Sequence, residues 1–216
     1  MSVAAKICGL NEAAAVRTAV SSGARFVGFV FYPPSPRAVT PEQARALAAL
    51  VPPEVKKVGL FVDADDAAIA AAVAAAKLDM LQLHGDETPA RVMELKRRTG
   101  LAAMKVLKIG EAADLDAAAA YRNAADWLMF DARPPKGMIG ALPGGNAVTF
   151  DWTLLAGRDW PLPWMLAGGL DAANLARAVA LSGARTVDVS SGVETVPGKK
   201  DAAKIRAFLA AAAATP

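Results

Sequence analysis

The sequence contains only one cysteine, Cys8, and only one histidine, His84, among its 216 residues. A lone cysteine cannot form an intramolecular disulfide, and one cysteine with one histidine supplies too few ligands for a zinc site made only of these residue types. We therefore expect no metal. The longest uncharged apolar stretch, residues 67–76, is about half of a membrane span, and no basic and apolar leader opens the chain. These absences predict a cytoplasmic protein without a membrane segment.

An excess of one charge is also missing, because 24 lysines and arginines nearly balance 21 acidic residues, for a net charge of +3. Basic residues are scattered, apart from short clusters at residues 96–98 and 199–200. Nucleic-acid-binding domains instead concentrate such residues on one surface. We expect no nucleic-acid partner, and the mild positive balance suits an anionic small molecule.

The chain does contain a repeated alternation of strand-like and helix-like segments. Eight β-type runs cover residues 4–7, 26–31, 57–62, 80–83, 103–107, 127–130, 164–167 and 186–189. Helical periodicity marks residues 12–22, 41–50, 65–77, 89–99, 112–121, 172–181 and 201–213. An open doubly wound sheet rarely fits eight units into this length, and its glycine fingerprint after the first strand is absent. The pattern predicts an α/β fold with one domain over residues 1–216, a single (β/α)8 TIM barrel.

Active sites of such barrels form at the C-terminal ends of the strands. Glycines and serines follow the last two predicted strands, and the loops at these places in a barrel often bind phosphate through backbone N–H groups. The alternative is that the glycines only make tight turns. Together the two loops favour a phosphorylated small-molecule substrate, bound by Gly168, Gly169, Ser190, Ser191 and Gly192.

Four side chains at other strand ends are candidates for the chemistry. Cys8 is a potential base if its pKa is lowered by a neighbouring positive charge such as Lys6 or by a bound substrate dipole, although a lone cysteine is more often a small buried apolar residue. Asp131 follows an apolar strand and suits a general acid, or else caps the chain or pairs with Arg133. The solitary His84 is equally compatible with a substrate contact and with a structural role. Arg37, in a proline-stiffened loop, suits a carboxylate or is a solvated surface residue.

The chain resembles the phosphoribosylanthranilate isomerase family along nearly its whole length. The motifs that carry this resemblance are Lys6-Ile7-Cys8-Gly9-Leu10, Gly28-Phe29-Val30-Phe31, Ser35-Pro36-Arg37, Gln82-Leu83-His84-Gly85, Phe130-Asp131, Pro143-Gly144-Gly145, Phe150-Asp151-Trp152, Leu166-Ala167-Gly168-Gly169-Leu170 and residues 187–194. Their order from the first strand to the last makes the resemblance specific.

The resemblance implies an Amadori rearrangement of N-(5′-phosphoribosyl)anthranilate in tryptophan biosynthesis, without a cofactor. It implies that Asp131 is the general acid that opens the sugar ring and that Cys8 is the general base at C2′. Arg37 would hold the anthranilate carboxylate, and the glycines and serines named above would surround the phosphate. Both a monomer and a homodimer fit the alanine-rich helices.

One segment departs from the family pattern. The irregular stretch from Asp131 to Thr149 is too long for an ordinary connection and is expected to be functional. After Pro143-Gly144-Gly145 the family commonly has Thr-Gly or Asn-Gly, whereas this chain has Asn146-Ala147. Alanine resists positive φ, so if position 147 needs it, closure of this loop over the substrate is expected to be weaker or differently shaped.

Two other functions share the phosphate loops. A metal-dependent epimerase needs several histidines and carboxylates, and an indole-glycerol-phosphate synthase has a catalytic lysine and an N-terminal extension. A phosphosugar-binding protein without catalysis is the remaining alternative, and the presence of both Cys8 and Asp131 argues against it.

Overall fold

The computed structural model describes residues 2–135, 137 and 142–216. Eight parallel strands form a closed barrel in which each strand pairs with the next and β8 returns to β1. The strands are β1 (Ala4–Cys8), β2 (Phe26–Val30), β3 (Lys56–Phe61), β4 (Met80–Leu83), β5 (Ala102–Ile109), β6 (Trp127–Ala132), β7 (Trp164–Leu166) and β8 (Thr186–Val189). The predicted TIM barrel is confirmed.

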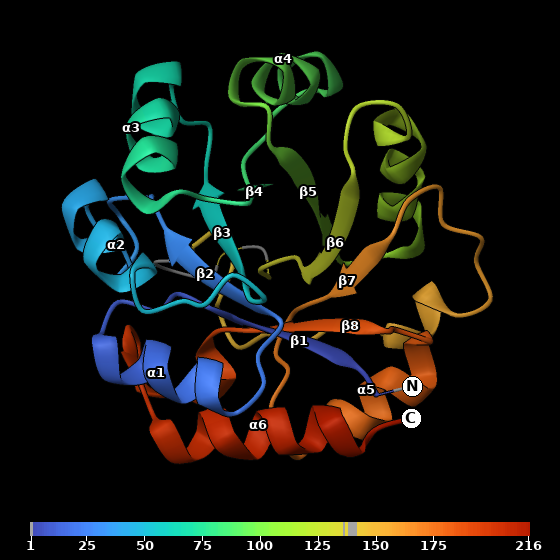
Figure 1. Cartoon of the computed structure of the whole chain (residues 1–216). Coiled ribbons are helices and arrows are strands. Elements are labelled where there is room, and N and C mark those ends of the chain that lie inside the picture. The colour runs from blue at the N-terminus through green and yellow to red at the C-terminus, as the bar shows by residue number, and fades with distance from the viewer. Residues whose placement is uncertain (1, 136, 138–141) are drawn as a thin grey trace.

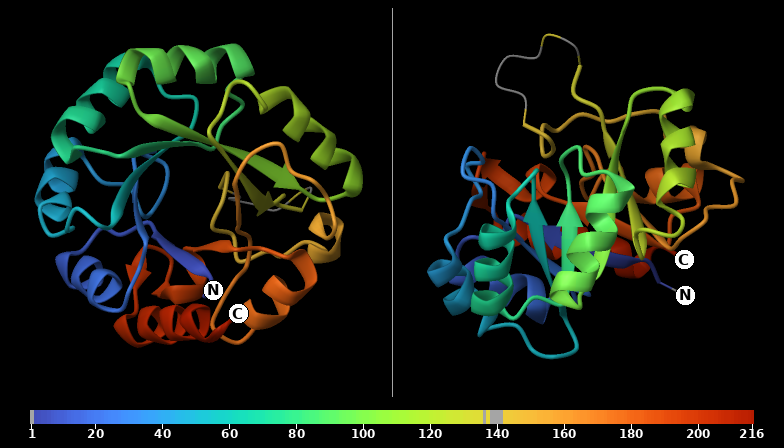
Figure 2. Two further views of the ribbon diagram at one scale, coloured as in Figure 1. Left: turned by 45° about the vertical axis from the view of Figure 1, so that its right-hand side comes forward. Right: turned by 90° about the horizontal axis from the view of Figure 1, so that it is seen from above.

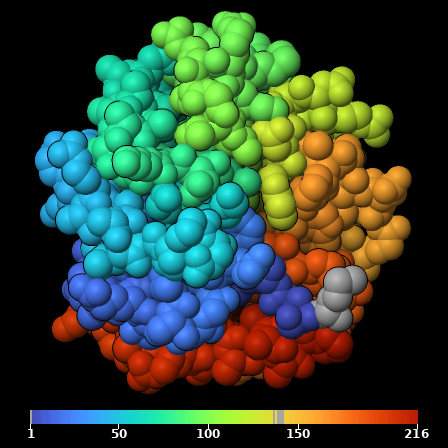
Figure 3. Space-filling model, viewed as in Figure 1, coloured from blue at the N-terminus to red at the C-terminus, as the bar shows by residue number. Residues whose placement is uncertain are grey.

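Helices surround the strands as an outer ring (Figures 1 and 2). They are α1 (Ala13–Ser21), α2 (Pro41–Ala48), α3 (Asp66–Ala76), α4 (Pro89–Thr99), η1 (Ala112–Tyr121), η2 (Trp152–Leu155), α5 (Leu175–Ser182) and α6 (Ala202–Ala214). The ring closes where α6 lies beside α1, so that blue and red segments meet in the space-filling view (Figure 3). Near this junction Val3 N donates to Thr215 O at 3.3 Å. No helix among the described residues is long and apolar enough to cross a bilayer.

Local sequence signals set several helix ends. Thr40 and Gln43 form a capping box at the start of α2, with Pro41 at the first helical position. Gly100 and Gly183 end α4 and α5 in the left-handed conformation that glycine adopts at low cost. These ends turn the chain back toward the next strand, and so bring all eight strand C-termini to one rim.

Two cores hold the barrel together. Apolar side chains between the sheet and the helices form the larger one, which includes Phe29, Phe61 and Phe208. A smaller core inside the barrel is formed mainly by Val58, Met80, Met104, Val106, Met129 and Met165. Because this inner core fills the lower barrel, the polar residues on the same inward faces lie above it, toward the C-terminal rim.

Several elements differ from the sequence prediction: the short helices η2 and η3 (Ser191–Val193) were not predicted, and three other differences bear on the fold. η1 is a 3-10 helix, and its buried residues Leu115 and Ala118 follow the three-residue period of that helix. The regular part of α5 starts at Leu175 instead of residue 172, and it is preceded by a turn in which Asp171 Oδ1 accepts the N–H groups of Ala173 and Asn174 in the manner of a helix N-cap. The third is an unexpected hairpin of β9 (Glu194–Val196) and β10 (Lys199–Lys200).

Candidate active site

Two adjoining cavities open at the C-terminal rim of the barrel. The first, of about 470 Å³, is lined by Cys8, Val30, Tyr32, Ser35, Arg37, Leu60, Val62, Gln82, His84, Asp131, Leu142, Pro143, Gly144, Gly145, Asp188 and Ser190. The second, of about 380 Å³, is lined by Asp131, Ala132, Gly145, Asn146, Val148, Ala167, Gly168, Gly169, Leu170, Asp188, Val189, Ser190 and Ser191. Asp131, Gly145, Asp188 and Ser190 line both. One ligand can therefore extend from an apolar chamber into a chamber of glycines and serines.

Cys8 is the last residue of β1 and lines the first cavity, although it is almost fully buried. The Lys6 side chain lies beside it and has no solvent exposure. A Cβ at Gly28 would lie 3.0 Å from both Cys8 Sγ and Lys6 Nζ, so these two atoms are no more than about 6 Å apart. Lys6 Nζ also donates to Asp188 Oδ1 at 2.9 Å. The thiol thus faces a buried ion pair.

Burial raises the pKa of Cys8, and the negative charge of Asp188 raises it further, while Lys6 acts in the opposite direction. Since burial outweighs the lysine, Lys6 alone does not give the lowered pKa that a base requires in the protein without a ligand. Burial alone would lower the pKa of Lys6, but Asp188 and Cys8 more than compensate and raise it. Lys6 therefore keeps its positive charge beside the sulfur.

Asp131 lies within β6, one residue before its end. Its Oδ1 accepts the N–H of Ala132 at 2.8 Å, and its Oδ2 lies 3.3 Å from His84 Nε2, without the alignment of a hydrogen bond. Arg133 contacts Asp114 instead, so the alternative pairing of Asp131 with Arg133 is wrong. A Cβ at Gly144 would lie 2.7 Å from Asp131 Oδ2, which shows how closely this loop covers the carboxylate.

His84 is held by a rigid network at the end of β4. Lys105 Nζ donates to Gly85 O and to Glu87 Oε2, each at 2.7 Å, and both charged side chains are buried. The other oxygen of Glu87 accepts the N–H groups of Asp63 and Gly85. This ion pair fixes the loop that brings His84 to Asp131.

Four of the five residues predicted to bind phosphate line the second cavity: Gly168, Gly169, Ser190 and Ser191. Gly168 and Gly169 have φ values of 90° and 62°, so they also make the tight turn that was the alternative interpretation. The fifth, Gly192, lines neither cavity and packs instead against the carbonyl of Leu170.

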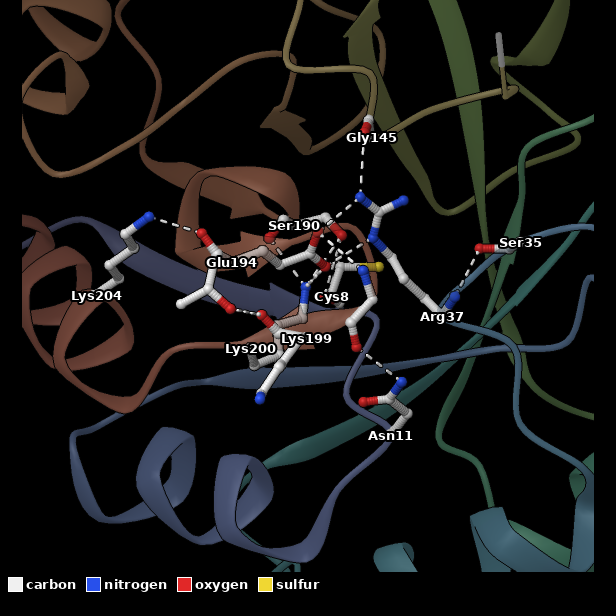
Figure 4. Close-up of polar contacts among 12 residues, drawn as sticks. Cys8, Asn11, Ser35, Arg37, Gly145, Ser190, Glu194, Lys199, Lys200 and Lys204 are labelled. Atoms are coloured by element: carbon white, nitrogen blue, oxygen red, sulfur yellow. Dashed lines mark hydrogen bonds and ion pairs between the residues drawn. The ribbon is translucent and has the colours of Figure 1, made fainter. Parts of the chain in front are cut away.

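Arg37 is buried and belongs to a network of charges at the rim, so its interpretation as a solvated surface residue is wrong. Its Nε and Nη2 donate to the two carboxylate oxygens of Glu194 at 2.8 and 2.9 Å, and Nη2 also donates to Gly145 O at 3.1 Å. Lys200 Nζ donates to Glu194 Oε1 at 2.7 Å and to Ser190 O at 2.9 Å. Figure 4 shows these side chains beside Cys8.

The rim network has an electrostatic consequence. Two basic side chains share one carboxylate, so Arg37, Lys200 and Glu194 together carry one net positive charge while Lys200 is protonated; burial lowers the pKa of Lys200, and Glu194 opposes this effect. Gly9 leaves room for this arrangement, since a Cβ there would lie 2.7 Å from Arg37 Cδ. No group of three His, Cys, Asp or Glu residues within the described ranges is placed to hold a metal ion. The positive charge of the rim network favours an anionic ligand.

A family model described as N-(5′-phosphoribosyl)anthranilate (PRA) isomerase matches residues 5–211. The chain belongs to this family. It is accordingly an enzyme of the isomerase class, as the motif resemblance predicted.

Individual relatives of the isomerase family cover the full chain. The N-(5′-phosphoribosyl)anthranilate isomerase of Paramagnetospirillum magneticum is 58% identical over 212 residues, which are 98% of each chain. A crystal structure of phosphoribosyl anthranilate isomerase in complex with reduced 1-(o-carboxyphenylamino)-1-deoxyribulose 5-phosphate matches with a TM-score of 0.84 and 33% identity, over 97% of this chain and 98% of that one. Monomers of the dimeric enzyme from Thermotoga maritima match with a TM-score of 0.83 and 33% identity, over the same fractions.

The Asn146-Ala147 pair, where this chain departs from the family pattern, has the backbone that the sequence suggested. Ala147 has a φ of 56° and is exposed, so an alanine occupies a left-handed position. Asn146 Nδ2 and Oδ1 bond Leu142 O and Leu142 N at 2.7 and 3.0 Å and hold this part of the loop. Residues 136 and 138–141 of the same segment lie outside the described residues.

Several site residues of this isomerase had no role assigned from sequence. Gln82, Asp188 and Glu194 belong to family motifs, but only the fold brings Gln82 and Asp188 to the first cavity and Glu194 to Arg37. Lys200 follows Pro197-Gly198, a pair typical of turns and a local sign of the hairpin that places it, although this hairpin was not among the elements expected from the sequence. Its partners are Glu194, the first residue of the hairpin, and Ser190, which directly follows β8.

Proposed function

We propose that this chain converts N-(5′-phosphoribosyl)anthranilate to 1-(2-carboxyphenylamino)-1-deoxyribulose 5-phosphate, the isomerisation in tryptophan biosynthesis for which its relatives are named. The observation that carries the proposal is the pair of joined cavities, with Asp131 on their shared wall and Cys8 in the first. The apolar chamber suits the aromatic ring, and the chamber of glycines and serines suits the phosphate.

The first chemical step opens the sugar ring. Asp131 donates a proton to the ring oxygen as the bond between that oxygen and C1′ breaks, and the nitrogen lone pair forms a C1′=N bond. The contact with His84 and the N–H of Ala132 orient the carboxyl group for this transfer. The product of the step is a protonated Schiff base.

The second step moves electrons back to the nitrogen. Cys8 as thiolate removes the proton from C2′, a C1′=C2′ bond forms, and the iminium electrons return to nitrogen. The resulting enolamine gains a proton at C1′ as the C2′ hydroxyl becomes a ketone. Lys6 supports this role, because its buried ammonium stabilises a negative sulfur nearby.

Binding contacts come from the two ends of the site. Arg37 holds the anthranilate carboxylate through the part of its guanidinium that Glu194 leaves free, Nη1. Gly168, Gly169, Ser190 and Ser191 surround the phosphate, with backbone N–H groups as donors. The chain itself supplies every group used, so the proposed reaction needs no cofactor or metal.

The assembly is proposed to be a monomer or a homodimer of one-domain subunits. Support for this choice comes from a relative, since the Thermotoga maritima enzyme is described as dimeric and also as monomers. Light scattering of the purified protein distinguishes the two states, and a trimer or larger assembly would contradict the proposal.

Fluorescence provides the test of the proposed reaction. N-(5′-phosphoribosyl)anthranilate is generated in situ from anthranilate and phosphoribosyl pyrophosphate, and loss of its fluorescence is followed with the purified chain. We expect decay much faster than the spontaneous rate and proportional to protein concentration. Decay at the spontaneous rate would refute the proposed function.

A further inference from the structure

Gln82 occupies an inward-facing position of β4, between Met80 below it and His84 above it in the barrel. Its side chain is 1% exposed. Within the described ranges the amide nitrogen donates only to Met129 Sδ, at 3.4 Å, and a thioether is a weak acceptor. The amide oxygen, Oε1, has no hydrogen-bond partner among the residues that the structure describes.

Such a side chain is costly for the barrel interior. Buried polar groups in folded proteins are nearly always hydrogen-bonded, and an unsatisfied amide destabilises the fold. The neighbouring inner core is built from Met80, Met104 and Met129, so a methionine in place of Gln82 would match its surroundings without that cost. Folding alone therefore does not explain the amide.

The position of Gln82 in the site suggests an explanation. Gln82 lies directly beside Leu60 of β3 in the strand register, and Leu60 belongs to the apolar wall of the first cavity. Cys8 and Asp131 line the same cavity. The amide therefore lies between the chamber for the aromatic ring and the residues that act on the sugar.

Apart from His84 Nε2, which lies 3.3 Å from Asp131 Oδ2 without a hydrogen bond, the charged groups of the same cavity have partners. Asp188 pairs with Lys6, Asp131 Oδ1 accepts from Ala132 N, and two nitrogens of Arg37 are bonded to Glu194. Gln82 Oε1 differs because it is a neutral acceptor with free capacity. It is suited to receive a hydrogen bond from a ligand.

We propose that Gln82 is a substrate-binding residue whose Oε1 accepts a hydrogen bond from the nitrogen that joins the aromatic ring to the sugar. The inference rests on the proposed function, in which this nitrogen becomes a cationic iminium N–H after ring opening. A hydrogen bond from a charged donor is stronger than one from a neutral amine, so the contact strengthens as the reaction proceeds. An uncharged amide provides this contact without taking the proton.

The variant Gln82→Met tests the proposal, since it keeps the length of the side chain and removes the amide. We expect kcat to fall by about 10- to 100-fold, because the lost contact is stronger after ring opening than in the bound substrate. KM should change by less than about threefold. The melting temperature should stay the same or rise, because an unsatisfied group has been removed.

Two further variants complete the experiment. Gln82→Glu keeps an acceptor oxygen at this place and should retain more kcat than Gln82→Met. Met80→Leu, on the same inward face of β4 but outside the cavity, is the control for repacking of the strand and should keep the parent kcat. If Gln82→Met folds poorly, Gln82→Leu gives the same comparison.

The outcomes separate the two proposals. A Gln82→Met kcat within twofold of the parent, a change confined to KM, or a melting temperature that falls together with kcat would overturn the role of Gln82. If the parent chain itself does not accelerate the reaction, the proposed function fails. In that case the melting temperature of Gln82→Met still shows whether the amide carries a structural role.

Discussion

Replacing Lys6 by methionine should make Cys8 a weaker acid and shift the activity profile to higher pH. Lys6 Nζ lies within about 6 Å of the sulfur and is fully buried, so solvent screens the interaction little. An opposite charge at this range changes a pKa by about 1 to 3 units. Without Lys6, the Asp188 carboxylate would add to the effect of burial, and both raise the pKa of the thiol.

The sign of the effect on activity follows from the role of the thiolate. At a neutral pH below the pKa, the thiolate fraction and kcat/KM should both fall by about 10- to 1000-fold. The deficit should narrow as the pH rises, because both proteins then carry the thiolate. The rising limb of the parent profile should itself lie above the ordinary range for cysteine, since burial raises the pKa of Cys8.

The single cysteine makes a direct measurement possible. The ionisation of Cys8 can be followed by the ultraviolet absorbance of the thiolate or by the rate of alkylation with iodoacetamide. Both signals come from Cys8 alone, because the chain has no other thiol. Lys56→Met is the matched control, because Lys56 is an exposed residue at the start of β3, the end of the strand away from the site. Should Lys6→Met unfold because Asp188 loses its partner, the double variant Lys6→Met with Asp188→Asn restores charge balance. A titration of Cys8 that is identical in folded Lys6→Met and in the parent would refute the reasoning; in the double variant the upward shift should be smaller, because loss of the Asp188 charge acts against it.

Two other predictions concern the rim. Ala147→Gly should stabilise the protein by about 0.5 to 1 kcal/mol, because it relieves a left-handed alanine at some cost in chain entropy. A higher melting temperature checks this, with Ala71→Gly in α3 as a control that should lower it. Glu194→Gln should raise KM and cost about 3 to 5 kcal/mol of stability by leaving Arg37 without its buried partner. Hydrogen bonds from Arg37 and the charge of Lys200 outweigh burial and lower the pKa of Glu194. The stability that ionised Glu194 gives the folded protein is therefore lost as pH falls below about 4 to 5. Urea titrations should show a smaller loss of stability over this pH range for Glu194→Gln than for the parent.

The barrel could be predicted because its signals are local. Each βα unit carries its own period, its own helix start such as Thr40-Pro41, and a glycine such as Gly100 at a helix end. The boundaries are less well specified than the elements themselves. Asp171 and Asn174 exchange side-chain-to-backbone hydrogen bonds, so residues 172–174 form a capped turn before the regular part of α5.

The site was only partly predictable, since its chemistry depends on contacts between distant parts of the chain. Position at a strand end was enough to select Cys8 and Asp131 as candidates. The net direction of the Cys8 pKa was not, because burial and the opposing effects of Lys6 and Asp188 are set by packing. The pairing of Arg37 with Glu194 joins residues 157 positions apart, and no sequence period reports such a contact.

The most direct test of the proposed acid–base pair compares Cys8→Ala and Asp131→Asn with the parent in the fluorescence assay. Each variant should lower kcat by about two to four orders of magnitude. Both variants should still bind reduced 1-(o-carboxyphenylamino)-1-deoxyribulose 5-phosphate, an analogue of the product. The affinity should be close to that of the parent, because Arg37 and the glycine and serine loops are unchanged. Near-normal turnover in either variant would contradict the role of that residue.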